Sequence, residues 1–308
     1  MLDTVFYSVV NMSITAGIMG LLILIIRKIP PIPKSGVYWM WALVLIRLLI
    51  PFSVSSRLSL LNFSGGLVKK VVTVPGTAEG GVGFSMSNSI GAAESYFPVT
   101  YKTHSLDMVF KIAAVIWIAG VAGLLLFWGL LLLMTNLRLK AVRPVRENIY
   151  TGELVESPMV HGFFRQRIFI PEAYKEDSRL DYILLHERIH IKRHDNLLRL
   201  AGLLAACVHW FNPLVWVFLK FFIDDMELTC DIRAVKGLSP EERKNYARTL
   251  MSLGTGRNTL LSAAFGQSNV KSRILNIINY KRLSVFALIM TMVFVAAASI
   301  VFLTNPSK

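Results

Sequence analysis

Three long uncharged stretches dominate the hydrophobic pattern of the chain: Val5–Ile26, Ile112–Met134 and Leu283–Leu303. A helix rises about 1.5 Å per residue, so each stretch is long enough to cross the roughly 30 Å hydrocarbon layer of a membrane. A fourth stretch, Val37–Val54, is shorter and contains Arg47, whose charged head must pair inside the helix bundle or reach an interface. The pattern therefore predicts a mainly α-helical membrane protein with four transmembrane helices.

The spans divide the chain into segments of different composition. The loop between the second and third spans contains runs of Gly and Ser that favour flexible coil, whereas the segment before the last span mixes apolar and charged residues. The expected division is two spans in 1–54, an extracellular loop in 55–107, the third span in 108–135, a large domain in 136–282, the fourth span in 283–303 and a tail in 304–308.

Basic residues gather at one end of three spans, and cytoplasmic flanks of spans accumulate Lys and Arg. These residues are Arg27, Lys28 and Lys34 after the first span, Arg138, Lys140, Arg143 and Arg146 after the third, and Lys281 and Arg282 before the last. The three flanks agree on one multi-pass topology. Both termini are expected outside and the 136–282 domain in the cytoplasm.

Composition supports the membrane prediction, with 54% hydrophobic and 17% charged residues. The net charge of +14 arises largely from the inner domain, because 23 of the 33 basic residues lie between Arg138 and Arg282. Membrane orientation and a lipid bilayer with anionic headgroups are sufficient reasons for this excess. We expect no direct nucleic-acid binding, since no basic stripe interleaved with aromatics is present. Cys207 and Cys230 lack Cys-x-x-Cys spacing and read as small buried residues.

The inner domain begins with β-branched and aromatic runs at Val145–Leu154 and Pro158–Pro171, which predict short strands with a turn at Gly162. Helical periodicity follows from Asp177. The apolar stretch near 197–223 is expected to form a membrane-associated helical hairpin bent at Asn212-Pro213, which returns to the side from which it started.

His186-Glu187-Arg188-Ile189-His190 fits the pattern His-Glu-x-x-His. On a helix His186 and His190 lie one turn apart on one face and can bind a single zinc ion through their imidazole nitrogens. Glu187 is placed to take a proton from water and pass it to the leaving amine. The other interpretation is an amphipathic helix with a solvated polar face.

A third ligand is expected in a second acidic helix, where Glu227 and Asp231 are one turn apart. Glu227 would complete a His₂Glu site for one Zn²⁺ per chain, as in gluzincin-like α+β metallopeptidase domains, and Asp231 would orient a histidine ring. A solvated acidic helix is the alternative. Tyr246 is a candidate to polarise the scissile carbonyl or, alternatively, a packing residue.

Other positions near the motif are less specific. His194 is interpreted as a spare polar residue, and His209, in an apolar run, as a buried histidine with its hydrogen bonds satisfied. Arg167–Ile170 could form a sheet edge to which a peptide substrate adds as a strand, or an inner strand of the sheet.

With these residues in view, the chain resembles the BlaR/MecR family of bacterial antibiotic-sensing signal transducers. The matching features are Trp41–Arg47 through Pro51, Ser157-Pro158 through Gly162 to Pro171, His186–His190 with Ile191-Lys192-Arg193, His209–Trp216, Glu227 through Cys230-Asp231, Tyr246-Ala247 and Arg273-Ile274. The resemblance implies a receptor in the bacterial cell membrane whose inner zinc domain cleaves itself, near Leu261–Asn269, and leads to loss of a cytoplasmic transcriptional repressor.

One departure from the family pattern matters. Full-length receptors carry a penicillin-binding sensor domain after the fourth span, whereas this sequence stops five residues after Leu303. Either the sequence is a truncated or sensor-less relative, or a separate sensor protein, a homodimeric partner or the outer loop at 55–107 receives the signal. The sequence predicts a zinc endopeptidase in transmembrane signalling that acts on itself and a repressor; the alternative is a non-catalytic scaffold that retains the zinc-peptidase fold.

Overall fold

The computed structural model describes residues 2–28, 34–51, 55–56, 104–254 and 270–280, together with 289–290, 293–294, 297 and 305–306. Most of the outer loop and of the fourth predicted span, and all of the expected cleavage segment Leu261–Asn269, lie outside these residues. The chain forms two compact units, and the helices α5 (His104–Arg138), α7 (Asp195–Val208) and α8 (Pro213–Val235) each contribute to both. Unit 1 comprises 1–124, 204–218 and 284–308, and unit 2 comprises 125–203 and 219–283.

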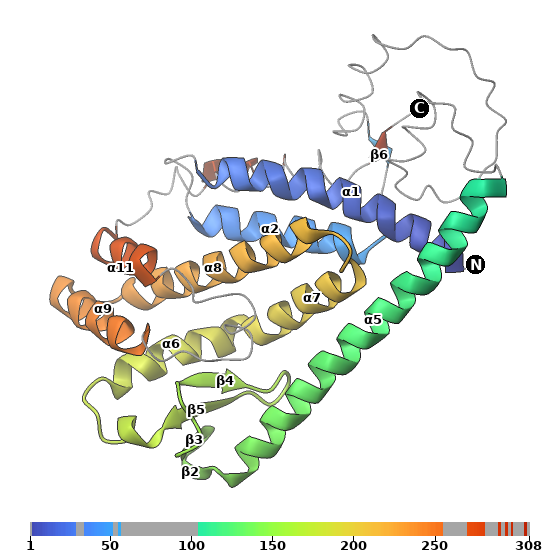
Figure 1. Cartoon of the computed structure of the whole chain (residues 1–308). Coiled ribbons are helices and arrows are strands. Elements are labelled where there is room, and N and C mark those ends of the chain that lie inside the picture. The colour runs from blue at the N-terminus through green and yellow to red at the C-terminus, as the bar shows by residue number, and fades with distance from the viewer. Residues whose placement is uncertain are drawn as a thin grey trace. The chain divides into compact units, whose positions relative to one another are not determined.

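Unit 1 is built from apolar helices: α1 (Leu2–Ile26), α2 (Lys34–Leu49) and the first part of α5 (His104–Arg138). Helices α1 and α2 pack against each other, as Figure 1 shows. Gly120 on α5 has no side chain to obstruct Trp210, since a Cβ there would lie 2.5 Å from the indole ring. Strands β1 (Ser55–Ser56) and β6 (Asn305–Pro306) form a short parallel pair.

Two described helices, Leu2–Ile26 and Met108–Ala141, are long and apolar enough to cross a membrane, and they contain the first and third predicted spans. With 16 residues, α2 is about 24 Å long at 1.5 Å per residue, shorter than a full crossing. The Arg47 side chain is buried, and its guanidinium nitrogens have no hydrogen-bond partner among the described residues. His209 is also buried, with Nε2 2.9 Å from the carbonyl oxygen of Leu48.

Unit 2 contains a four-stranded sheet with the order β2-β3-β5-β4. Its strands and flanking 3₁₀ turns are η1 (Leu139–Ala141), β2 (Arg143–Arg146), β3 (Ile149–Gly152), β4 (Met159–His161), β5 (Arg167–Pro171) and η2 (Glu172–Tyr174). β5 is parallel to β3 and antiparallel to β4. The predicted strands and the turn at Gly162 are thus confirmed. Of the two interpretations of Arg167–Ile170, the inner strand is confirmed and the sheet edge is wrong, because both sides of β5 are paired. The edge strands are β2 and β4.

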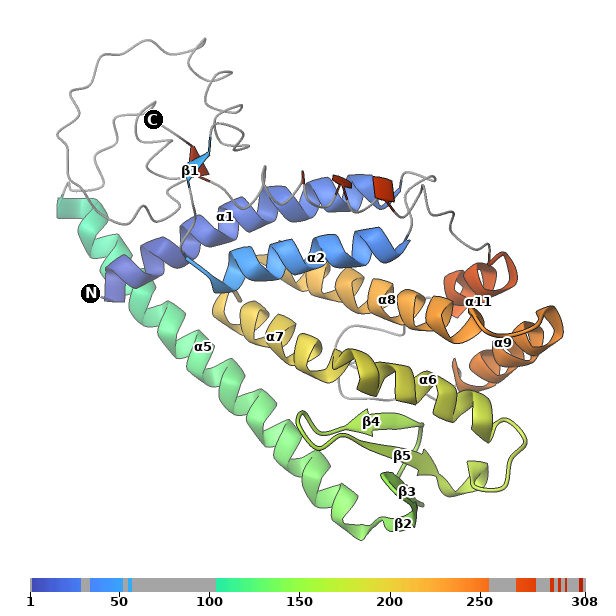
Figure 2. The same ribbon diagram turned by 180° about the vertical axis from the view of Figure 1, so that it is seen from behind.

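Helices follow this sheet in the chain, and the first of them packs against it. They are α6 (Leu180–Arg193), α7 (Asp195–Val208), α8 (Pro213–Val235), α9 (Pro240–Gly254) and α11 (Val270–Ile278). Helix α8 begins at Pro213, the proline at which the sequence predicts a bend. Figures 1 and 2 show α6 running along the sheet, with its opposite side towards α8, α9 and α11. Ile183 and Leu184 of α6 pack into the sheet core with Ile149, Ile168 and Ile170.

Candidate metal centre

Helix α6 places three buried polar side chains in the interior of unit 2. His186, Glu187 and His190 are 4%, 4% and 3% exposed. Because the two histidines are one helical turn apart, their rings are neighbours, and their Nε2 atoms lie 3.1 Å from each other. Packing of the same helix against the sheet fixes the direction in which these side chains point.

The end of α6 fixes the orientation of His190. His194 adopts a left-handed conformation with φ of 55°, and its N–H donates to the carbonyl oxygens of His190 and Ile191. Helix α7 begins directly afterwards, and Asp195 Oδ2 lies 2.6 Å from His190 Nδ1. Asp195 is fully buried. Nδ1 of His190 is therefore paired with Asp195, which leaves Nε2 of the same ring facing His186.

Glu227 approaches the same two nitrogens from α8. Its Oε2 lies 3.5 Å from His186 Nε2, and its Oε1 lies 3.6 Å from His190 Nε2. Tetrahedral zinc with bonds of about 2.0–2.2 Å separates neighbouring donor atoms by roughly 3.3 Å. The observed separations of 3.1, 3.5 and 3.6 Å lie near that value, and the two to Glu227 each involve a different oxygen of the carboxylate. The donor types and their spacing therefore fit a zinc ion.

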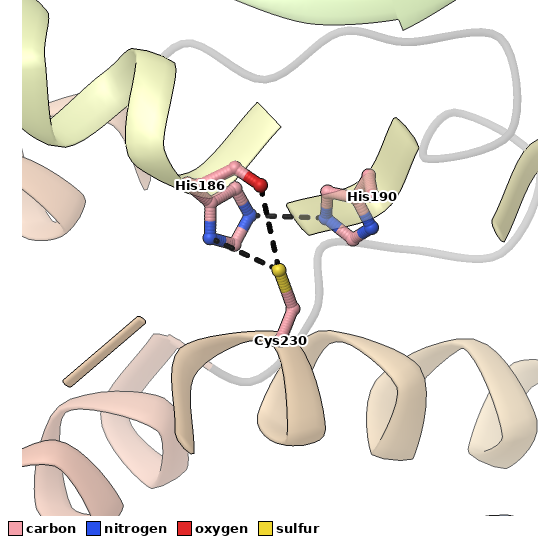
Figure 3. Close-up of side chains that lie close together, drawn as sticks. All are labelled: His186, His190 and Cys230. Atoms are coloured by element: carbon pink, nitrogen blue, oxygen red, sulfur yellow. Dashed lines mark hydrogen bonds between the residues drawn. The ribbon is translucent and has the colours of Figure 1, made fainter. Parts of the chain in front are cut away.

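Cys230 adds a fourth potential donor, which the sequence pattern did not single out. Its thiol is buried and belongs with His186 and His190 to a group of donor atoms within 4.8 Å of one another. Figure 3 shows the thiol reaching from α8 towards the two rings. Sγ lies 3.6 Å from His186 Nδ1, the nitrogen on the other side of the ring from Nε2. Cys230 and Glu227 thus meet different nitrogens of His186.

Two arginines hold the carboxylate of Glu227. Arg199 Nη2 lies 2.7 Å from Oε1, and Arg273 Nη1 lies 3.2 Å from Oε2. Arg273 is only 2% exposed and also binds Asp231 through Nε at 2.6 Å and Nη2 at 2.9 Å. The positive charge of Arg273 therefore compensates two buried carboxylates, and α11 is connected directly to the candidate ligand on α8.

Asp231 reaches His186 chiefly through Tyr246. The Tyr246 hydroxyl donates to Asp231 Oδ1 at 2.7 Å and lies 2.8 Å from His186 Nδ1. Direct separation between Asp231 Oδ1 and His186 Nδ1 is 3.4 Å. Tyr246 is therefore engaged on the Nδ1 side of the ring, away from the nitrogen that faces Glu227.

The buried groups of this cluster shift one another's pKa values. Burial opposes charge on His190, but Cys230, Glu227 and Asp195 outweigh it and raise the pKa of His190 to about 9. Burial raises the pKa of the Cys230 thiol, yet His186 and His190 lower it to about 7. Burial would also raise the pKa of Asp231, but Arg273 holds that pKa well below its usual range. Because histidine binds a metal as the neutral imidazole, metal binding at His190 has to displace a proton at neutral pH.

The structure brings together every residue that the sequence marked as a candidate: His186, Glu187, His190, Glu227, Asp231 and Tyr246 are all buried in unit 2. Sequence reasoning missed Asp195, Arg199 and Arg273 as partners of the donor residues. Asp195 had a usable signal, since an acidic residue at the start of the next helix is only five positions from His190. Arg199 had no such signal, and Arg273 was noted only as part of the family resemblance, because the partners of both arginines are met only in the folded chain.

Replacing Asp195 by asparagine is expected to weaken zinc binding by about 10–100-fold, because a neutral side chain orients and polarises the His190 ring less strongly. Zinc affinity of the purified protein, measured by competition with a chelating dye, checks this. Asp181→Asn, an exposed position on the same helix, is the matched control. Equal affinities of Asp195→Asn and wild type would contradict a role for Asp195 at the metal centre.

Comparison with known proteins agrees with the character of this site. A family model described as BlaR1 peptidase M56 matches residues 7–277, which include all the side chains discussed above. The regulatory protein BlaR1 of Bacillus licheniformis is 27% identical over 220 residues, which cover 61% of this chain and 36% of that protein. BlaR1 of Staphylococcus aureus is 26% identical over 289 residues, covering 83% and 48%. The Staphylococcus epidermidis methicillin resistance mecR1 protein is 26% identical over 129 residues, covering 39% and 22%. The matched segment thus spans less than half of each relative.

Proposed function

Since the chain belongs to the BlaR1 peptidase M56 family, we propose that it is a zinc endopeptidase of the bacterial cell membrane that acts in transmembrane signalling. One observation carries the catalytic part of this proposal. The Nε2 atoms of His186 and His190 and the carboxylate of Glu227 converge within 3.1–3.6 Å in a buried site, close to the separation of neighbouring ligands around a zinc ion.

In this proposal His186, His190 and Glu227 hold one Zn²⁺ per chain. When bound, the ion supplies Lewis-acid chemistry, which makes a water molecule more acidic and polarises the carbonyl of the scissile peptide. The carboxylate of Glu187 accepts the proton of the attacking water and delivers it to the nitrogen of the leaving amine. Burial of Glu187 at 4% exposure excludes competing solvent from this transfer.

The surrounding side chains keep the ligands in place. Asp195 fixes the ring of His190, and the pair of Tyr246 and Asp231 fixes the ring of His186. We assign Tyr246 this positioning role in place of carbonyl polarisation, because its hydroxyl is engaged on the Nδ1 side. We prefer Glu227 to Cys230 as the third ligand, since Glu227 faces the Nε2 atoms of both rings and a His₂Glu set is typical of catalytic gluzincin-like sites.

The membrane arrangement follows the predicted topology, with four spans, both termini outside and the 136–282 domain in the cytoplasm. Helices α1 and α5 support two of the spans by length and apolar character. The basic residues that follow these helices support the inner location of unit 2. The hairpin of α7 and α8 near 197–223 is proposed to associate with the membrane and return to the cytoplasmic side.

A peptide substrate is proposed to bind along β4, the sheet edge that contacts α6. One such substrate is the chain itself, near Leu261–Asn269. That segment lies outside the described residues, but the helices on either side of it both contribute to the metal centre, α9 through Tyr246 and α11 through Arg273. A cytoplasmic transcriptional repressor is proposed as the downstream target, and a separate sensor protein or a second copy as the partner that delivers the signal.

Chelation tests the catalytic proposal. Purified wild-type protein in membranes is expected to contain one zinc per chain, to lose cleavage when a chelator removes the ion, and to regain it when zinc is restored, because the donors alone cannot activate water. Zinc content and the mass of the fragments are the measurements. Protein without stoichiometric zinc, or cleavage that continues after metal removal, would favour a non-catalytic signalling scaffold that retains the fold.

A further inference from the structure

The turn between β4 and β5, residues 162–166, presents an aromatic side chain to the surroundings. Phe164 is 93% exposed, and Arg165 beside it is exposed as well. Burying a phenylalanine side chain is worth about 1.5–3 kcal/mol relative to exposure in water. An aromatic residue held this far out of the protein interior therefore indicates a surface that meets an apolar or amphipathic partner.

The turn has a defined conformation. Gly162 has φ of 97°, and a Cβ there would lie 2.5 Å from the carbonyl oxygen of Arg165, so the tight turn requires glycine. Asn196 of α7 donates its side-chain amide to the carbonyl oxygen of Gly162 at 3.1 Å. Gln166 donates to the carbonyl oxygen of Phe163 at 3.3 Å. These bonds hold the position from which Phe164 projects.

A contact with α5 places this turn near the end of a membrane span. His161, the residue before the turn, lies with Nε2 2.7 Å from Asn136 Oδ1. Asn136 comes two residues after Met134, where the uncharged stretch of α5 ends. Phe164 is three residues after His161, and three residues of extended chain reach about 10 Å. Phe164 must therefore lie close to the end of the uncharged stretch of α5. Figure 1 shows the end of the β4–β5 hairpin beside α5.

The adjoining part of α5 is an apolar surface within the same unit. Its exposed side chains, each 42–65% accessible, are Leu125, Leu126, Phe127, Leu130, Leu133, Met134 and Leu137. In a membrane protein such a strip faces lipid, and aromatic residues gather where the hydrocarbon meets the headgroups. Basic side chains such as Arg165 are attracted to anionic headgroups at the cytoplasmic surface.

We propose that residues 162–166 form a membrane-contacting turn that inserts Phe164 into the headgroup region of the inner leaflet, with Arg165 at the anionic headgroups. The proposal depends on α5 crossing the membrane and is independent of catalysis. The turn is also connected to the metal centre. Asn196 Oδ1 accepts a hydrogen bond from Arg199 Nη1 at 3.4 Å, and Arg199 Nη2 binds Glu227.

Site-directed spin labelling of the full chain in vesicles containing anionic phosphatidylglycerol tests this contact. Phe164→Cys and a matched control, Leu154→Cys, each receive a nitroxide; Leu154 is also apolar and 62% exposed in unit 2. The native thiols Cys207 and Cys230 are buried, and wild-type protein treated in the same way measures any label that they take up. Collisions with oxygen, which concentrates in lipid, are compared with collisions with a neutral, water-soluble nickel chelate.

The ratio of oxygen to nickel-chelate accessibility is expected to be several-fold higher at Phe164→Cys than at Leu154→Cys. A ratio at position 164 no higher than that at position 154 would overturn the proposal, whether the label is in water or covered by another protein. Wild-type-like thermal unfolding of Phe164→Cys ensures that the label reports on folded protein. The test measures membrane contact and does not depend on cleavage.

Discussion

Replacing Glu187 by glutamine is expected to reduce cleavage by about 10²–10⁴-fold while zinc remains bound, because general acid–base catalysis contributes a factor of this size. Glutamine keeps the size of the side chain but cannot accept the proton of the attacking water at neutral pH. The donors His186, His190 and Glu227 are untouched. Loss of activity with retained metal therefore separates the proton-transfer role of Glu187 from any role in holding zinc.

The experiment compares wild type, Glu187→Gln and Glu176→Gln in the same membranes, with fragments quantified by mass spectrometry and zinc by elemental analysis. Glu176 is an exposed glutamate shortly before α6 and serves as the control for loss of one carboxylate. A fragment that forms in Glu187→Gln at the wild-type rate would sink the catalytic assignment and favour the scaffold. Loss of zinc in Glu187→Gln would instead show that Glu187 supports the metal centre.

Replacing Arg273 by methionine is expected to cost about 3–5 kcal/mol of stability, the range found when one partner of a buried ion pair is removed. Arg273 is 2% exposed and Asp231 is fully buried, so Asp231 would lose its bidentate partner without gaining water. Glu227 would lose one of its two arginine partners and keep Arg199. Methionine fills much of the same volume, so lost charge compensation dominates the effect.

Thermal unfolding of the metal-free protein in detergent measures this loss, with Arg248→Met as the control. Arg248 is an exposed arginine of α9, and its Nη1 donates to Asn245 Oδ1 at 2.9 Å. The double variant Asp231→Leu/Arg273→Met is expected to recover part of the stability, because it removes both charges together. An unfolding temperature of Arg273→Met equal to that of Arg248→Met would show that the ion pair contributes little.

The parts of the site that follow local periodicity could be predicted from the sequence. His186 and His190 share a helix face because four residues make about one turn, and Glu227 and Asp231 share one for the same reason. The apolar helices α1 and α5 and the strands around Gly162 were likewise predicted by local patterns. Neighbouring residues along the chain determine each of these features.

Features that depend on pairing between distant segments could not be predicted in the same way. Arg167–Ile170 has the composition of a strand, but only the sheet order shows that β5 is inside and β4 is at the edge. Arg273 reaches Asp231 from a helix that begins at Val270, and no spacing rule relates them. Cys230 lacks a neighbouring cysteine, so its place beside His186 becomes visible only when α8 packs against α6.

The order of the donor residues along the chain has a consequence for biosynthesis. His186 and His190 precede α7, whereas Glu227 follows the bend between α7 and α8. A nascent chain that has emerged only as far as α7 carries two imidazoles and no third ligand. If zinc binds as proposed, the ion can bind tightly only after α8 has packed alongside α7, where Arg199 contacts Glu227. The bound ion would then connect the two ends of the hairpin. A chain whose hairpin was inserted in the wrong orientation would therefore remain without zinc.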